Sequence, residues 1–128
     1  MPKQQLRIDS GPVPAASPYS PGLRVGDFVF VSGQVPRHPA TGKIVGETIE
    51  EQTTQVLENI KAILALGGAT MADVVNVGAH LSDLALFERY NKVHVEYFPD
   101  PKPTRTTVGS QLLGFLVEIE AIAYVGKE

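Results

Sequence analysis

Two segments of this chain repeat apolar residues at helical spacing, and each segment carries a single apolar stripe. The stripe within residues 48–68 consists of Ile49, Val56, Leu57, Ile60, Ile63 and Leu64. The stripe within residues 83–98 consists of Phe87, Tyr90, His94, Tyr97 and Phe98. A helix with one apolar stripe must bury it against another layer, so two such helices can cover only one face of a sheet. The pattern predicts an α+β fold, with two helices on one face of a mixed sheet.

Capping signals mark the ends of both predicted helices. Thr48 and Glu51 have the spacing of a capping box, and Gly67-Gly68 closes the first helix. Asp83 can cap the second helix, and the two prolines that follow residue 98 stop it.

Strand-length segments surround these helices. Two short strands flank Gly26-Asp27, and three more are predicted at Val74–Leu81, Thr104–Ser110 and Leu116–Tyr124. The element order is then ββαβαββ. We expect the last two strands to be antiparallel neighbours joined by the short turn Gln111–Phe115.

The helices leave the opposite face of the sheet uncovered, and we expect another subunit to cover it. The strand Phe28–Ser32 is almost wholly apolar, which is typical of a buried strand. With 128 residues the chain is expected to form one domain, residues 1–128. Residues 1–16 are expected to be a strand or loop segment, and Gly11–Gly22 is too rich in proline for a helix or a central strand.

The composition excludes several classes of chemistry. Cysteine is absent, which rules out disulfides, thiolate catalysis and metal sites built on cysteine. His38, His80 and His94 lack the spacing of a metal motif, so no metal is expected. The net charge of −3 disfavours nucleic acids and anionic membranes as partners. No segment is typical of a signal peptide or a transmembrane helix, so we expect a cytoplasmic location.

Charged residues near the C-terminus are candidates for a functional site. Arg105 lies on one predicted strand, and Glu118 and Glu120 share a face of the next one, because residues two apart point the same way. If these strands pair, the Arg105 guanidinium could bind a carboxylate while Glu118 orients or deprotonates a water. An exposed Arg–Glu ion pair is the alternative, and it contributes little to stability. The residues alone favour the ion pair over a functional site, and both interpretations stay open at this point.

Other polar residues carry less specific signals. Ser32 lacks the G-x-S-x-G pattern of a nucleophile, and none of the three histidines has a sequence neighbour that suggests a catalytic triad. Tyr19, within SPYSPG, can either pack on the core or form the wall of a pocket.

Six motifs occur in one order along the chain: SPYSPGL, FVFVSGQVPRHPATGKIVG, LENIKAIL, DLALFERYNKVHVEYF, PTRTTV and VEIEAIA. Together they resemble the RidA (reactive intermediate deaminase) family, also known as the endoribonuclease L-PSP family. The match covers residues 17–124. The resemblance implies a fold similar to that of the trimeric chorismate mutase, with three subunits that pack their sheets into a central β-barrel and hold pockets at their interfaces.

The resemblance also implies an activity and the residues that carry it. Members hydrolyse 2-imino and enamine acids, such as 2-iminopropanoate and 2-iminobutanoate, to 2-keto acids and ammonia without a metal or cofactor. Arg105 would bind the substrate carboxylate, and Glu118 would position or activate the attacking water. The substrate-binding residues implied are Tyr19, Ser32, Gly33, Asn91 and Thr107. Glu120 matches a second glutamate with a structural role.

Two departures from the family pattern concern the rim of the pocket. Thr107 stands where relatives often have cysteine, but its backbone N–H can still donate to the substrate carboxylate. The short turn Gln111–Phe115 replaces a longer turn of the family pattern, so the preference for a particular substrate side chain is left undefined.

The same resemblance is compatible with other functions. Relatives have been described as endoribonucleases or translation inhibitors, and some act as chaperone-like or regulatory binding proteins. The acidic balance and scattered Lys and Arg residues disfavour RNA. A ligand sensor that binds a keto acid or fatty acid without turnover is a third interpretation.

Overall fold

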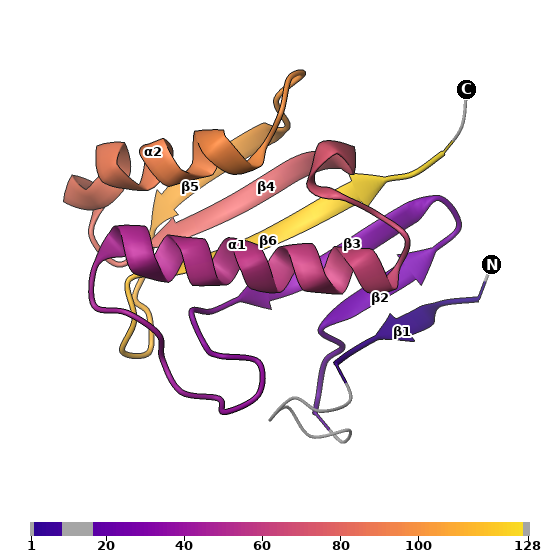
Figure 1. The fold of residues 1–128 in the computed structure, drawn as a ribbon, viewed down its shortest axis with the longest axis horizontal. Coiled ribbons are helices and arrows are strands. Elements are labelled where there is room, and N and C mark those ends of the chain that lie inside the picture. Colours follow the sequence, from indigo (N-terminus) through magenta and orange to yellow (C-terminus); the bar gives the residue numbers. More distant parts are fainter. Residues whose placement is uncertain (1, 9–16, 127–128) are drawn as a thin grey trace.

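The computed structural model describes residues 2–8 and 17–126, and it confirms the predicted α+β fold. Its elements are β1 (Gln4–Leu6), β2 (Gly22–Val25), β3 (Phe28–Gln34), α1 (Ile49–Leu66), a 3-10 turn (Met71–Asp73), β4 (Val74–Leu81), a second 3-10 turn (Leu84–Leu86), α2 (Phe87–Tyr97), β5 (Thr104–Gly109) and β6 (Val117–Tyr124). Both helices lie on one face of the sheet (Figure 1). The strand β1 is an additional N-terminal strand, which the order ββαβαββ expected from the apolar pattern does not include. Most of the predicted Gly11–Gly22 loop lies outside the described residues.

The sheet has the order β1-β2-β3-β6-β4-β5, with β4 and β5 parallel and every other neighbouring pair antiparallel. The predicted pairing of Thr104–Ser110 with Leu116–Tyr124 is therefore wrong, because β4 lies between β5 and β6. Helix α2 connects β4 to β5, and such a crossover places the second strand parallel to the first. The chain then returns through β6 into the space between β3 and β4.

The core lies between the helices and one face of the sheet. All six residues of the predicted α1 stripe are buried. They pack against alternate residues of the central strands, among them Val29, Val77, Val117 and Ile119, which have no exposed surface. Each fully buried side chain of this size stabilises the fold by about 2 kcal/mol.

The other face of the sheet, which we call the open face, carries solvent-exposed aromatic side chains. Phe28, Phe30 and Tyr124 are 42%, 40% and 43% exposed, and the Phe28 ring lies 5.2 Å from that of Tyr124 and 6.2 Å from that of Phe30, centroid to centroid. The expectation that Phe28–Ser32 is buried is thus wrong for half of the strand: Val29 and Val31 face the helices, and the phenylalanines do not.

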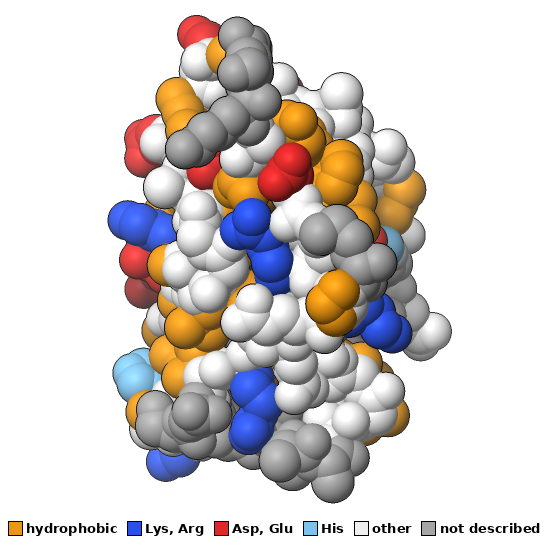
Figure 2. All heavy atoms as spheres, turned by 90° about the vertical axis from the view of Figure 1, so that its right-hand side faces the viewer, with side chains coloured by type: hydrophobic (Ala, Val, Ile, Leu, Met, Phe, Trp, Pro, Cys, Tyr) orange, Lys and Arg blue, Asp and Glu red, His pale blue; other side chains and the backbone are white. Residues whose placement is uncertain are grey.

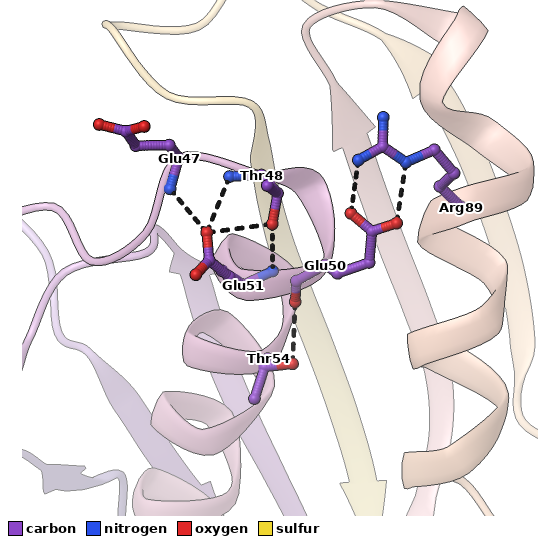
Figure 3. A network of polar contacts seen from close by, with 6 residues as sticks. All are labelled: Glu47, Thr48, Glu50, Glu51, Thr54 and Arg89. Carbon is purple, nitrogen blue, oxygen red and sulfur yellow. Dashed lines mark hydrogen bonds and ion pairs between the residues drawn. The ribbon is translucent and has the colours of Figure 1, made fainter.

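The predicted capping box begins α1. The Thr48 hydroxyl accepts from the Glu51 N–H at 3.1 Å, and the Glu51 carboxylate accepts from the Glu47 and Thr48 N–H groups (Figure 3). These bonds, led by the one from Glu47, lower the pKa of Glu51. Asp83 caps the 3-10 turn at Leu84–Leu86 rather than the helix itself, so α2 begins at Phe87.

An ion pair on the surface joins the two helices. Arg89 of α2 donates two hydrogen bonds, of 2.8 and 2.6 Å, to the Glu50 carboxylate of α1 (Figure 3). The bond from Arg89 lowers the pKa of Glu50 to about 2. Because both side chains are exposed, the pair aligns the helices more than it stabilises them.

The cap predicts a stability difference between two threonines of α1. Thr48→Ala should lower the free energy of unfolding by about 1 kcal/mol, because the Glu51 N–H loses its acceptor. Thr54→Ala is the matched control, since the Thr54 hydroxyl only donates to the Glu50 carbonyl within the helix, and we expect a change below about 0.5 kcal/mol. Urea unfolding measures both, and equal losses would contradict the role of the cap.

Candidate functional site

Arg105 lies beneath α2, on the helix-covered side of the edge strand β5. It pairs with Val77 of β4, which is fully buried under the helices. One guanidinium nitrogen donates to the Asn91 side-chain oxygen at 2.7 Å. The guanidinium carbon lies 5.5 Å from the ring centres of both Phe87 and Tyr90, within the range of a cation–π contact. The structure thus brings together Arg105 and Asn91, two residues implied for the site.

The half-buried Arg105 has no acidic partner within residues 2–8 and 17–126. Its contacts are an amide oxygen and two aromatic rings, all neutral. A partly desolvated guanidinium gains most from a carboxylate that it can bind through two parallel hydrogen bonds. The exposed Arg105–Glu118 ion pair that the sequence favoured is therefore wrong, and an anionic ligand is the natural partner for this charge.

The groups of α2 beside Arg105 stay uncharged at neutral pH. A hydrogen bond of 2.9 Å joins the Tyr90 hydroxyl to His94 Nδ1. Burial, together with the positive charges of Arg105 and Lys102, lowers the pKa of His94 to about 4. Burial also raises the pKa of Tyr90 to about 12. Tyr90 and His94 consequently do not compensate the positive charge of Arg105.

Thr107 lies two residues beyond Arg105, on the same side of β5. It pairs with the buried Ala79, and its hydroxyl is buried without a partner in the described part of the chain. A buried hydroxyl without a partner is costly. It is therefore a polar group available to a ligand bound at Arg105.

Glu118 points to the opposite face of the sheet from Arg105. Its carboxylate lies directly against Gly33 of β3, and a Cβ on Gly33 would collide with Glu118 Oε2. Among the described residues, none donates a hydrogen bond to this carboxylate. The lack of a side chain at Gly33 therefore allows Glu118 to occupy this place with its oxygens open to a water or a ligand.

Glu120 shares this face with Glu118, as predicted, but it is differently engaged. His80 Nε2 lies 3.2 Å from Glu120 Oε1, and the Glu120 side chain leans over Gly78 of β4. Glu120 is thus held by a histidine, while Glu118 has no such contact in the described part of the chain.

The N-terminal loop is fastened to the end of β3. The Ser32 hydroxyl donates to the Ser20 carbonyl at 2.6 Å, and the Ser32 N–H donates to the Pro21 carbonyl at 2.9 Å. Tyr19 is 56% exposed and lines a cavity of about 190 Å³ together with Gly33. Of the two interpretations left open for Tyr19, the pocket wall is the one that the structure supports.

The implied site residues form two separate groups in one chain. Arg105 and Thr107 of the edge strand β5 lie under α2, which carries Asn91. Glu118 and Gly33 lie on the open face, with β4 between their strands and β5. The expectation that Arg105 and Glu118 approach each other within one chain is therefore wrong. Only the strand order reveals this separation, because the two residues fall on strands that are consecutive in the sequence.

The described residues contain no cluster of three or more His, Cys, Asp or Glu side chains able to hold a metal ion. No helix among them is long and apolar enough to cross a membrane.

Comparison with known proteins identifies the family. The sequence matches the model described as Endoribonuclease L-PSP over residues 11–125. A RutC family protein of Pyrococcus abyssi is 47% identical over 126 residues, which are 97% of this chain and 98% of that protein. Reactive Intermediate Deaminase A, chloroplastic, of Arabidopsis thaliana is 41% identical over 94% of this chain and 65% of that protein.

A solved structure agrees in fold as well as in sequence. The crystal structure of RidA from an Antarctic Psychrobacter species superposes with a TM-score of 0.86 at 37% identity, covering 95% of this chain and 99% of that one. The chain therefore belongs to the endoribonuclease L-PSP family, whose relatives include proteins named RidA and RutC.

The neutral His94 predicts a pH-dependent stability. Its pKa is about 4 in the folded chain, against 6.5 for an unperturbed histidine. Between these values the unfolded chain binds a proton that the folded chain does not. The free energy of unfolding therefore decreases by roughly 1 kcal/mol for each unit by which the pH is lowered. Urea unfolding measured from neutral pH down to about pH 4 tests this decrease in stability. His94→Asn, which keeps a hydrogen-bonding group for Tyr90, should lack this slope; an identical slope would contradict the assignment.

Proposed function

We propose that this protein is a 2-imino acid deaminase, which hydrolyses reactive imines and enamines to 2-keto acids and ammonia. The observation that carries the proposal is the half-buried Arg105, which Asn91 orients and which no described carboxylate neutralises. The name of the Arabidopsis relative, Reactive Intermediate Deaminase A, supports the same chemistry.

Binding of the substrate carboxylate determines the orientation of the imine. The carboxylate accepts two hydrogen bonds from Arg105, and the Thr107 backbone N–H adds a third. The Thr107 hydroxyl, which has no partner among residues 2–8 and 17–126, lies on the same side of the strand. Orientation is most of what the reaction needs, since imines of this kind react with water unaided.

Glu118 serves as the base. Its carboxylate takes a proton from a water as the water oxygen bonds to the imine carbon, and returns that proton to the nitrogen to give a carbinolamine. The hydroxyl proton of this intermediate then passes through Glu118 to the nitrogen. The C–N bond breaks, and ammonia and the 2-keto acid leave. The residues themselves supply every proton transfer, so the proposal invokes no cofactor and no metal.

The separation of Arg105 from Glu118 supports a site shared between subunits. Arg105, Asn91 and Thr107 of one subunit would face Glu118 and Tyr19 of the next. The open aromatic face of the sheet, centred on Phe30, is the surface that a neighbour would cover, and we propose a homotrimer with the sheets facing inward.

The absence of cysteine supports a cytoplasmic location.

The assembly has a direct test in solution. Three chains of 13.8 kDa should sediment together at about 41 kDa. Phe30→Asp places a charge on the open face and should give monomers, because the charge would lose its water in the interface. Val95→Asp is the control, since Val95 is 52% exposed on α2 and should leave the trimer intact. A monomeric wild type would refute the shared site.

The deaminase activity is tested by coupling the protein to a threonine or serine dehydratase and trapping the imine with semicarbazide. Wild type should reduce the trapped imine. Arg105→Ala should lower kcat/KM at least about 100-fold through loss of carboxylate binding. Arg89→Ala is the matched control, because Arg89 only pairs with Glu50 on the surface. Glu118→Gln should lower kcat by about 100-fold with a smaller effect on KM.

The outcomes separate the proposal from its competitors. Unchanged trapping with wild type would reject the deaminase, and undiminished activity in Arg105→Ala would reject the site. Binding of a keto acid without imine hydrolysis would indicate a ligand sensor.

The family description makes RNA the second candidate partner. The charge distribution argues against it: the Lys and Arg side chains on the surface in Figure 2 stand apart from one another rather than forming a stripe. RNA affinity measured over a range of salt concentrations decides the matter, since phosphate contacts produce a steep salt dependence.

A further inference from the structure

Two glycines let the two acids of β6 lean toward opposite neighbouring strands. Glu118 lies against Gly33 of β3. Glu120 pairs with Gly78 of β4, and its side chain lies over that glycine, where a Cβ would be only 2.9 Å from Glu120 Cγ. The carboxylates of Glu118 and Glu120 are therefore drawn apart on the open face.

His80 holds the second of these acids in place. Its Nε2 lies 3.2 Å from Glu120 Oε1, and its Nδ1 lies 2.9 Å from Ser110 Oγ. An ionised Glu120 can only accept, so Nε2 carries the hydrogen and donates it, while Nδ1 accepts from the Ser110 hydroxyl. Because both ring nitrogens are engaged, the imidazole is held in one orientation and one tautomer.

His80 is also the direct cross-strand neighbour of Glu118. The two residues are register partners on β4 and β6, and side chains directly opposite each other on antiparallel strands stand about 5 Å apart at Cβ. Among the described residues, the ring nevertheless bonds to Glu120 and Ser110 and not to Glu118. The histidine thus engages one acid and leaves the carboxylate of the other open.

This engagement matters most when a neighbouring subunit covers the open face. Glu118 and Glu120 lie two residues apart on one strand, about 7 Å along it, and their charges repel more strongly where water is excluded. A released Glu120 could swing toward Glu118 and share a proton with it, as paired carboxylates do. Glu118 would then no longer accept a proton from the attacking water.

We propose that His80 is a positioning residue of the deaminase site, which holds Glu120 over Gly78 so that, of the two acids, Glu118 alone acts as the base. Ser110 orients the ring for this task. The role rests on the deaminase activity proposed above. It needs no access from solvent, because His80 acts on Glu120 within the covered face and does not touch the substrate.

The test measures kcat and KM of the full-length protein in the dehydratase-coupled assay. His80→Phe fills a similar space without a donor. It should lower kcat at least about 10-fold and change KM less than about twofold, because Arg105 still binds the substrate carboxylate. His80→Gln keeps a donor for Glu120 and should retain kcat within about threefold of the wild-type value.

Asn76→Ala is the matched control. Asn76 lies on β4 like His80, and its side chain also bonds across to the β5 side, to the Thr104 hydroxyl at 2.8 Å. Its register partner is Ile122 rather than an acid. Loss of this bond should leave kcat and KM unchanged, so a general weakening of the strand would be recognised by an equal loss in both variants.

A second substitution separates positioning from a structural role. Glu120→Gln removes the charge that His80 holds away, and by itself it should leave kcat within about threefold of the wild-type value. Combined with His80→Phe, it should restore kcat to the same range, because an uncharged amide neither repels Glu118 nor takes up its proton. Damage to the fold would not be repaired in this way, and sedimentation at about 41 kDa checks the assembly of each variant.

The outcomes distinguish this role from the deaminase itself. An active wild type with undiminished kcat in His80→Phe, or with a loss that Glu120→Gln does not repair, would overturn the role of His80 and leave the deaminase standing. An inactive wild type would overturn the deaminase, and with it this role.

Discussion

The insertion of β6 between β3 and β4 is the constraint on which the other features depend. As a central strand with antiparallel neighbours on both sides, β6 buries Val117 and Ile119 under the helices. The pleat then forces Glu118 and Glu120 onto the opposite face, one against β3 and the other against β4. The same insertion displaces β5 to the edge, where Arg105 reaches α2 instead of meeting an acid. The separation of the two charges follows from strand order alone.

The chemistry of the Arg105 edge depends on keeping its neighbours neutral. Burial holds His94 in its uncharged form and Tyr90 in its protonated form, so the α2 side chains that contact Arg105 provide aromatic surface and one amide oxygen but no negative charge. A guanidinium in such surroundings has lost part of its water without gaining an ion pair. Its free energy is lowered most by a planar anion, which is why the site favours a carboxylate substrate over a structural role for Arg105.

Prediction from sequence was reliable where the interactions are local. The stripe of α1, its capping box at Thr48 and its end before Gly67 are confirmed, because a helix is set by contacts three and four residues apart. The start of α2 was misplaced by the 3-10 turn that Asp83 caps. The pairing of the last two strands was wrong, since a strand pattern records which face is apolar and not which strand lies alongside.

The amino-acid sequence by itself determined the α+β class, the helix ends, the alternation that places Glu118 and Glu120 on one face, and, through family motifs, the residues to examine. Only the tertiary structure decided that Arg105 has no acidic partner among the described residues, that Gly33 makes room for Glu118, and that Ser110 and Glu120 meet at His80. Those contacts join residues 14 to 40 positions apart, or strands that are neighbours in the sheet but far apart in the sequence. Their physical cause is the packing of whole elements, which no local pattern of residues encodes.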